Sequence, residues 1–262
     1  MHVLVDSHCH LDAGEFDPDR DAVLDRARAA GVTRQVVPAT DAAGWPKLRG
    51  ICAGTGGLHP AYGLHPMFLD RHRPGHLGEL REWIERERPV AVGECGLDYY
   101  VDGLDRDAQQ DYFDGQLRLA RDSALPVIVH ARRAVDAVVA AIRGVGGLRG
   151  VVHSFAGSQE QARQLWKLDF MIGLGGPLTY ERAKRLRRIV AAMPIEHLLL
   201  ETDAPDQPDA EIRGRRNEPA RLRHVLDTVA ELRGESPDAV AAATTANAER
   251  LFGLASATDG RE

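Results

Sequence analysis

The sequence predicts an α/β protein, a TIM-type (β/α)8 barrel, on three observations. Eight short apolar runs rich in β-branched residues recur along the chain and alternate with stretches of helical periodicity. Each run is apolar throughout, which is typical of strands covered on both faces. The length of 262 residues is close to the roughly 250 residues of such a barrel. An open doubly wound sheet is the alternative, although no glycine-rich phosphate loop follows the first run.

The expected strands are short and spread evenly over the chain. In chain order they are residues 2–6, 34–39, 61–64, 89–93, 126–130, 150–154, 170–175 and 197–201. Helical spacing of apolar residues appears between and after them, at residues 19–31, 186–193, 220–234 and 237–252. In the first of these helices Val23, Leu24 and Ala27 share one side, and Gly31 is expected to cap the carboxyl end.

The composition indicates one ordinary globular domain. Hydrophobic residues make up 44% of the chain and charged residues 27%, with a net charge of −6. No linker or low-complexity block divides the sequence, so we expect one domain over residues 1–254 and a disordered polar tail at 255–262. No apolar run reaches the roughly 20 residues of a membrane span, and no signal peptide is expected. Three cysteines without framework spacing favour reduced thiols in a cytoplasmic protein, and no obligate protein partner is expected.

Polar side chains cluster where the expected strands end. His8 and His10 follow the first strand, and the two-residue period of a strand puts them on one side with Cys9 facing away. The other members of the set follow or end later strands: His65, Glu94, His130, His153 and Asp203. In a barrel the carboxyl ends of all strands open on one face, where active sites are built. The sequence therefore predicts that these residues meet.

Each of these residues also has a structural interpretation when taken alone. A single histidine at a strand end can be a hydrogen-bonded structural residue, and Glu94 can be an ion-pair partner. Asp203 can be the N-cap of a helix, and Cys9 and Cys95 are expected to be small core residues. The whole set is poor material for a core, because buried charge is costly unless it is paired or bound to metal.

The chemistry of the set points to divalent metal ions. Imidazole and carboxylate suit Zn²⁺, Mn²⁺ or Fe²⁺, whereas a mixed nitrogen and oxygen set is less typical of Mg²⁺ without excluding it. Without His65, the four histidines and two carboxylates of the set are too many for one tetrahedral zinc and suit two ions that share a bridging carboxylate. Two such ions clamp a phosphoryl group and lower the pKa of a bound water. We expect Glu94 to be the bridge, and Asp203 to bind one ion and take the proton of the attacking water.

The residues resemble a known family over most of the chain. The stretches that carry the resemblance are "DSHCHLD", "YGLHP", "GECGLDYY", "PVIVHAR", "VVHSFAGS", "GGPLTY", "LLLETDAP" and "RNEPA". Together they resemble the signature stretches of the TatD family of metal-dependent deoxyribonucleases, in order from residue 5 to residue 252. The resemblance implies a TIM barrel related to the amidohydrolases with a one- or two-metal site. Matched by motif, the implied metal ligands are His8, His10, Glu94, His130, His153 and Asp203.

Substrate contacts are predicted at four further positions. Arg132 follows His130 by two residues, and the resemblance supports a phosphate contact there. Arg216 and Asn217 stand at an expected helix start, where backbone N–H groups favour anions. His65 is the fourth predicted contact. The family often has a second histidine after "HP", but this chain has Met67, which puts in doubt a contact near the third strand.

The predicted activity is hydrolysis of DNA by a metal-activated water, in the form of an exonuclease that trims 3′ ends. The alternative is an ester or amide hydrolase with the same site, such as a deacylase of aminoacyl-tRNA. A third hypothesis is a protein that only binds metal. Structural zinc sites, however, usually rely on cysteine and leave no position open for water, whereas this set leaves positions open.

Overall fold

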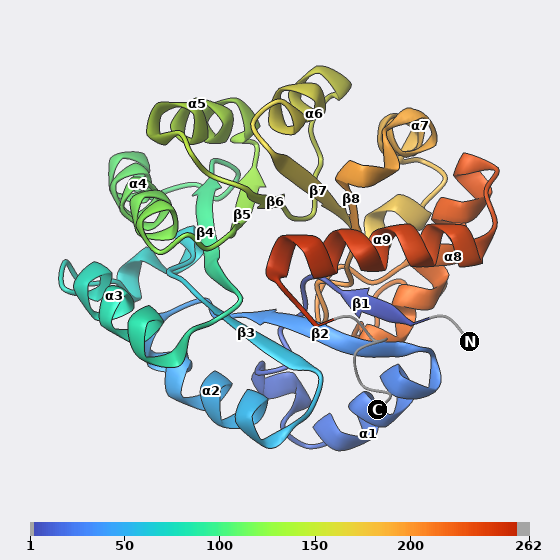
Figure 1. Cartoon of the computed structure of the whole chain (residues 1–262), viewed down its shortest axis with the longest axis horizontal. Helices are drawn as coiled ribbons and strands as arrows, with labels where there is room; N and C mark the ends of the chain where they lie inside the picture. Colours follow the sequence, from blue (N-terminus) through green and yellow to red (C-terminus); the bar gives the residue numbers. More distant parts are fainter. Residues whose placement is uncertain (1–2, 256–262) are drawn as a thin grey trace. The chain divides into compact units, whose positions relative to one another are not determined.

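The computed structural model describes residues 3–255, and its eight strands lie in one sheet in the order β1 to β8 (Figure 1). The strands are β1 (Leu4–Asp6), β2 (Val32–Pro38), β3 (Leu58–Tyr62), β4 (Ala91–Asp98), β5 (Val127–Arg132), β6 (Gly150–Val152), β7 (Phe170–Leu174) and β8 (Leu198–Leu200). A doubly wound sheet reverses its strand order near the middle, whereas this order is sequential. The predicted fold class, a (β/α)8 barrel, is confirmed, and the doubly wound alternative is wrong.

Helices follow the strands along the chain. They are α1 (Arg20–Ala29), α2 (Trp45–Gly54), α3 (His76–Glu87), α4 (Arg106–Asp122), α5 (Val135–Val145), α6 (Gln159–Trp166), α7 (Lys184–Ala192), α8 (Leu222–Arg233) and α9 (Pro237–Phe252). The predicted helix at 237–252 has the bounds of α9. Gly31, with φ 89°, follows the end of α1 as expected of a carboxyl-terminal cap. Within residues 3–255, none of the helices combines the length and the apolar character needed to span a membrane.

The chain divides into two compact units. The first unit comprises the residues up to Val37 together with those from Ile172 onward, and the second unit comprises Pro38–Met171. The prediction of a single domain over residues 1–254 stays a prediction. Most of the predicted polar tail, residues 256–262, lies outside the described residues.

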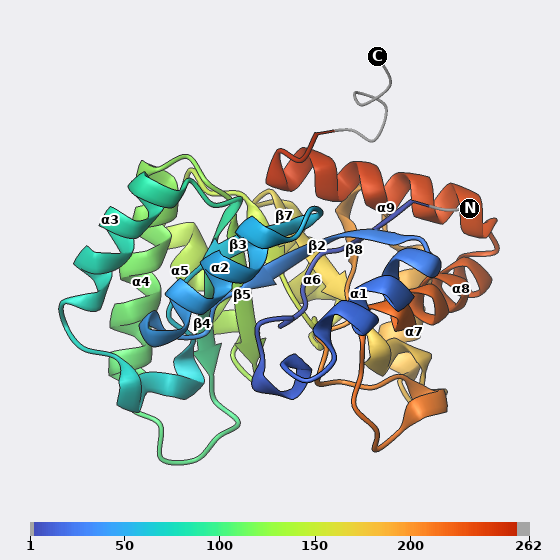
Figure 2. The ribbon, with the colours of Figure 1, turned by 90° about the horizontal axis from the view of Figure 1, so that it is seen from below.

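In the first unit, α9 covers one end of β1 and β8. The Asn247 amide donates to the Leu198 carbonyl over 2.9 Å, and the Thr245 hydroxyl donates to the Val3 carbonyl over 2.8 Å. Leu198 begins β8 and Val3 directly precedes β1, and Figure 2 shows α9 beside the start of β1. β1 pairs in parallel with β2, and the Ser7 N–H donates to the Leu200 carbonyl at the end of β8. The carboxyl ends of β1 and β8 are therefore neighbours on the side away from α9.

In the second unit, β4 is longer than predicted, because Gly93 and Gly96 let it lie close to β5. β4 pairs in parallel with β5 as far as Asp98 and Arg132, with a register shift between Val92 and Cys95. Gly96 has φ 142°, and a Cβ there would lie 2.1 Å from the His130 carbonyl oxygen. A residue with a side chain does not fit this contact. The predicted end of the strand at Gly93 was wrong, and Glu94 lies within β4 rather than after it.

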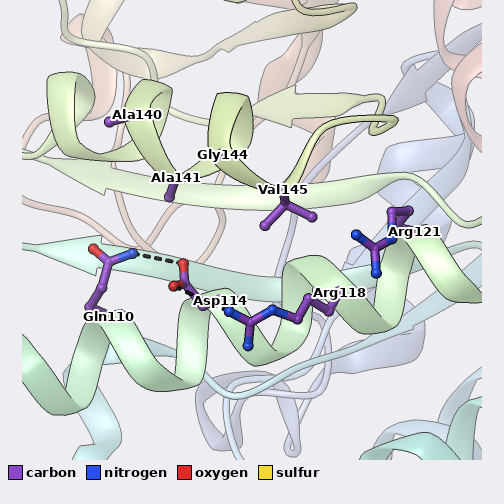
Figure 3. Close-up of a pocket in the computed structure, with 8 residues that line it drawn as sticks. All are labelled: Gln110, Asp114, Arg118, Arg121, Ala140, Ala141, Gly144 and Val145. Carbon is purple, nitrogen blue, oxygen red and sulfur yellow. Dashed lines mark hydrogen bonds and ion pairs between the residues drawn. The ribbon is translucent and has the colours of Figure 1, made fainter.

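Helices α3, α4 and α5 lie on one side of β3, β4 and β5 (Figure 1). A depression of about 420 Å³ separates α4 from α5 (Figure 3), lined by Gln110, Asp114, Arg118, Arg121, Ala140, Ala141, Gly144 and Val145. The depression exists because the residues of α5 that line it are mostly small. Beside it, the Gln110 side-chain amide donates a hydrogen bond of 2.8 Å to Asp114. None of the predicted site residues lines it.

Candidate functional site

Three predicted ligands of the first unit lie together, and we call His8, His10 and Asp203 the His8 group. His8 Nε2 and His10 Nε2 are 3.2 Å apart, and each is 3.5 Å from Asp203 Oδ1. The two imidazole rings meet edge to face, with centroids 5.0 Å apart. Cys9 is fully buried with its Sγ 4.0 Å from the Val36 carbonyl. The predicted alternation is confirmed: both histidines share one side and the cysteine faces the other.

The backbone after β8 brings Asp203 to the histidines. The Asp203 N–H donates to the His8 carbonyl over 2.9 Å, and the His10 N–H donates to the Ala204 carbonyl over 2.7 Å. Asp203 adopts φ 56°, a left-handed conformation that aspartate and asparagine tolerate better than most residues. The Gln207 amide donates to Asp203 Oδ2. No helix begins at Asp203, so the N-cap interpretation was wrong.

Asp6, two residues before His8, joins the segment after β1 to the segment after β8 by hydrogen bonds to Thr202. Its buried carboxylate accepts hydrogen bonds from the Thr202 N–H over 3.0 Å and the Thr202 hydroxyl over 2.6 Å. Burial raises the pKa of Asp6 to about 7, although these hydrogen bonds oppose the rise. Glu201 is a second buried acid, and a Cβ at Gly173 would lie 2.1 Å from its Oε2. Neither acid was among the predicted residues.

In the second unit, three histidines surround one carboxylate oxygen, and we call His65, Glu94, His130 and His153 the Glu94 group. Glu94 Oε1 lies 2.7 Å from His153 Nε2, 3.0 Å from His65 Nε2 and 3.2 Å from His130 Nδ1. Glu94 is only 1% exposed. Burial lowers the pKa of the His65 imidazole, against the attraction of Glu94. His65, predicted as a substrate contact, therefore lies among the predicted ligands.

Asp98 is a site residue that the sequence prediction missed. Its Oδ2 lies 3.0 Å from His130 Nε2, which leaves His130 Nδ1 facing Glu94. Burial alone would raise the pKa of Asp98, but hydrogen bonds from His130, Val101 and Tyr100 outweigh it and lower the pKa to about 2. Burial also works against a charged His130, yet the Asp98 and Glu94 contacts raise the pKa of its imidazole. Asp98 thus fixes both the ring orientation and the electrostatics of a predicted ligand.

The donor atoms of each group suit a cation bound among them. In tetrahedral zinc sites, metal–nitrogen distances of about 2.1 Å put neighbouring ligand atoms about 3.4 Å apart. The His8 group has separations of 3.2 and 3.5 Å. In the Glu94 group, His130 Nδ1 and His153 Nε2 are 3.3 Å apart. A carboxylate that orients a metal-binding histidine is a usual companion of such sites, and Asp98 contacts the predicted ligand His130 in this way. The residues therefore fit divalent metal.

Two of the four predicted substrate contacts are engaged elsewhere in the first unit. The Arg216 guanidinium forms two hydrogen bonds to Asp19, of 2.9 and 2.7 Å, and one to the Glu15 carbonyl. Asn217 is only 1% exposed, and its amide nitrogen lies within 3.3 Å of the carbonyls of Thr202, Asp206 and Gln207. These contacts favour structural roles, and substrate binding by either residue stays a prediction. Arg132 is exposed at the end of β5, and Met67 is 39% exposed.

Asn217 holds the loop that carries Asp203, and its removal is expected to destabilise the fold. Asn217→Ala leaves buried carbonyls without a donor, which costs about 1–3 kcal/mol of unfolding free energy, visible as a lowered Tm. Asn217→Asp keeps the volume and the acceptor for the Glu218 N–H but also lacks the donor, so it should be destabilised similarly. A raised KM with an unchanged Tm in both variants would instead favour the predicted substrate contact.

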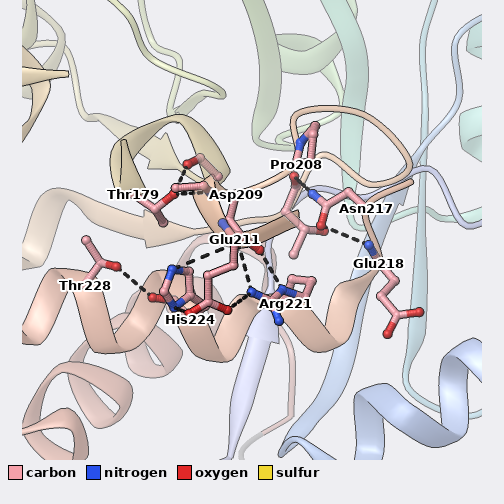
Figure 4. Close-up of polar contacts among 12 residues, drawn as sticks. Thr179, Pro208, Asp209, Glu211, Asn217, Glu218, Arg221, His224 and Thr228 are labelled. Atoms are coloured by element: carbon pink, nitrogen blue, oxygen red, sulfur yellow. Dashed lines mark hydrogen bonds and ion pairs between the residues drawn. The ribbon is translucent and has the colours of Figure 1, made fainter. Parts of the chain in front are cut away.

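A further acidic cluster in the first unit is already neutralised by an arginine (Figure 4). Asp209, Glu211 and His224 lie close enough to share an ion. Arg221 donates to both Asp209 oxygens, over 2.6 and 2.9 Å, and to Glu211 over 2.6 Å. Burial would raise the pKa of Asp209, but Arg221 outweighs it and the pKa falls. The guanidinium supplies the positive charge here, so this cluster is an ion pair that ties the loop after β8 to α8.

Comparison with known proteins decides the family. The family model described as TatD related DNase matches residues 5–253. The chain belongs to the TatD family. The uncharacterised metal-dependent hydrolase YjjV of Escherichia coli K12 is 40% identical over 253 residues, which cover 95% of this chain and 98% of the relative. The crystal structure of YjjV matches with a TM-score of 0.93 at 39% identity, over 96% of this chain and 98% of that one.

A TatD relative with a named activity is also similar over its length. The 3′-5′ ssDNA/RNA exonuclease TatD of Cronobacter sakazakii is 35% identical over 256 residues, covering 95% of this chain and 97% of the relative. These findings confirm the predicted family and enzyme class, and the chain is a TatD-family metal-dependent hydrolase. Neither relative is named for ester or amide hydrolysis.

Proposed function

We propose that this chain is a metal-dependent nuclease that hydrolyses phosphodiester bonds at the 3′ end of single-stranded DNA. The observation that carries the proposal is the Glu94 group, in which one buried carboxylate oxygen lies within 3.2 Å of three imidazole nitrogens. Such a set is costly to bury without a positive charge among its members. A family member that is named a metal-dependent hydrolase supports a metal ion as the source of that charge.

Two divalent ions are proposed, Zn²⁺, Mn²⁺ or Mg²⁺, held by six residues that lie in parallel strands or shortly after them. The ligands are His8, His10 and Asp203 from the His8 group with Glu94, His130 and His153 from the Glu94 group. In a (β/α)8 barrel the carboxyl ends of all strands lie on one face, which is the reason to assign both groups to one centre. When bound, such ions activate water and offset the charge of the phosphoryl group. Glu94 is the proposed bridging ligand.

Asp203 is the proposed general base. Oδ1 faces the two histidine nitrogens of the His8 group, and Gln207 holds Oδ2. In this position Asp203 accepts the proton of the water that attacks phosphorus, while the bond between phosphorus and the leaving sugar oxygen breaks. The strained left-handed backbone of Asp203 is a conformation that recurs at functional sites. Asp98 and Asp6 support the arrangement by orienting His130 and the segment before Asp203.

A phosphodiester is preferred over a carboxylic ester or an amide as the substrate class. Arg132 is exposed two residues beyond His130, where a guanidinium suits a phosphate. The name of the Cronobacter sakazakii relative, an ssDNA/RNA exonuclease, supports the same choice. A cytoplasmic location and the absence of an obligate protein partner stay predictions.

The test is reconstitution of metal-free protein with Mg²⁺, Mn²⁺ or Zn²⁺. Single-stranded DNA, abasic DNA and an aminoacyl-tRNA mimic are offered in parallel, and release of nucleotides or amino acid is followed. We expect nucleotide release from DNA with at least one metal, and none in excess chelator. The His8 and Glu94 groups contain no lysine or arginine that could replace a metal ion beside the phosphate. Full DNA cleavage by protein shown to be metal-free by elemental analysis would refute the mechanism. Turnover of the aminoacyl-tRNA mimic alone would refute the substrate class.

A further inference from the structure

Tyr100 is an exposed aromatic residue beside the Glu94 group. It is 46% exposed, more than any other large hydrophobic residue among residues 3–255. It stands two residues after Asp98, the end of β4, and the Tyr99 N–H donates to the Arg132 carbonyl at the end of β5. An aromatic ring that is half open to solvent at the carboxyl end of barrel strands is in a position suited to ligand contact.

Two arginines lie against the Tyr100 ring. The guanidinium carbons of Arg132 and Arg133 are 3.7 and 4.7 Å from its centroid, within cation–π range. Both arginines are exposed, and neither forms an ion pair with a carboxylate among residues 3–255. Arg216 and Arg221, by contrast, are neutralised by Asp19 and Asp209. The arginines beside Tyr100 therefore carry positive charge that the protein itself does not offset.

The same carboxylate holds the backbone of Tyr100 and contacts a predicted metal ligand. Asp98 Oδ1 accepts the Tyr100 N–H over 2.8 Å and the Val101 N–H over 3.0 Å, while Oδ2 contacts His130. Arg133 has φ 54°, a left-handed conformation that is unfavourable for arginine. Local strain of this kind persists where the surrounding structure holds it, often at ligand sites. Asp98 thus links the backbone of Tyr100 to His130, and the two arginines lie against the ring itself.

We infer that Tyr100, Arg132 and Arg133 form a platform on which one unpaired nucleobase of the substrate stacks, with the arginines contacting the neighbouring phosphate. Aromatic rings and guanidinium planes both stack on bases without regard to sequence. Bases in a duplex are already stacked and paired, so the platform selects single strands. This inference rests on the proposed nuclease function and names the feature of the substrate that this surface recognises.

The test compares two substrates with the metal-loaded enzyme. One is a single-stranded oligonucleotide, and the other is an oligomer of equal length built wholly of abasic sugar–phosphate units. Tyr100→Ala is expected to lower kcat/KM about 5- to 150-fold on the first, the range for loss of one base–aromatic stack, mainly through KM. The loss should shrink to less than about twofold on the second, which has no base to stack. Tyr100→Phe should keep the wild-type preference, because the ring is retained.

The arginines have a separate readout. Replacing both Arg132 and Arg133 by alanine should reduce the slope of log KM against log salt by about 1.4, since each lost contact to a single strand removes about 0.7. The matched control replaces Arg118 and Arg121 of α4, exposed arginines in the same unit, and should leave the kinetics on both substrates unchanged.

Equal losses on both substrates in Tyr100→Ala, or no loss, would overturn the platform while the nuclease function stands. A wild-type enzyme that cleaves neither substrate would overturn the proposed function, and the platform with it.

Discussion

Asp203→Asn is expected to lower turnover of single-stranded DNA by at least about 10²–10⁴-fold, the usual contribution of general acid–base catalysis. Asparagine also tolerates the left-handed backbone at this position, so the loop after β8 keeps its path. Its amide oxygen still faces His8 and His10 and coordinates metal weakly. It cannot, however, accept the proton of the attacking water. The rate should therefore fall far more than the Tm or the metal content.

The matched control is Asp206→Asn, the same chemical change at an exposed residue three positions along the same loop. It should leave turnover and Tm near those of the wild type. Both variants are measured for kcat, Tm and metal stoichiometry. An Asp203→Asn enzyme with near-normal kcat and a lowered Tm would show that Asp203 serves the loop and not the reaction.

Glu94→Gln is expected to reduce both metal content and rate. Glu94 Oε1 is the atom on which His65, His130 and His153 converge, and glutamine removes its negative charge at almost unchanged volume. Even residues that only orient metal ligands are worth about 10–100-fold in metal affinity or activity, so a ligand should cost at least that much. The measurement is metal stoichiometry after equilibrium dialysis at graded metal concentrations, followed by kcat at saturating metal.

Glu85→Gln, an exposed glutamate of α3, is the control for a lost negative charge and should bind metal as the wild type does. Glu94→Gln and Asp203→Asn are thereby distinguished, because the first loses metal and the second mainly loses rate. Retention of the full metal content by Glu94→Gln, at every metal concentration, would contradict the assignment of Glu94 as a bridging ligand.

Local patterns were sufficient to predict the fold and the residues of the His8 and Glu94 groups. Eight apolar runs gave the eight strands, because strands covered on both faces have few polar positions. The two-residue period of extended backbone predicted that His8 and His10 share one side, and their ring nitrogens lie 3.2 Å apart just after β1. Resemblance to the TatD motifs then separated the predicted ligands from other histidines.

Contacts between distant segments were not predictable in the same way. Asp98 was missed because β4 seemed to end at Gly93, although its spacing of four from Glu94 places it on the same face of a continued strand. The anion-binding role suggested for Asn217 assumed a free helix start, whereas its amide is engaged by carbonyls 10 to 15 residues earlier. Stacking of Arg132 and Arg133 on Tyr100 depends on how the loop after β4 folds beside β5, which no short motif encodes.

The most direct test of the metal centre is the position of the metal itself. Crystals of the wild-type protein grown with Zn²⁺ would be measured on both sides of the zinc absorption edge, and an anomalous difference map calculated. The predicted result is a peak about 2.0–2.2 Å from Glu94 Oε1, the usual distance between zinc and a carboxylate oxygen. Zinc bound only elsewhere, for example at Asp209, Glu211 and His224, with no peak at Glu94, would contradict the account.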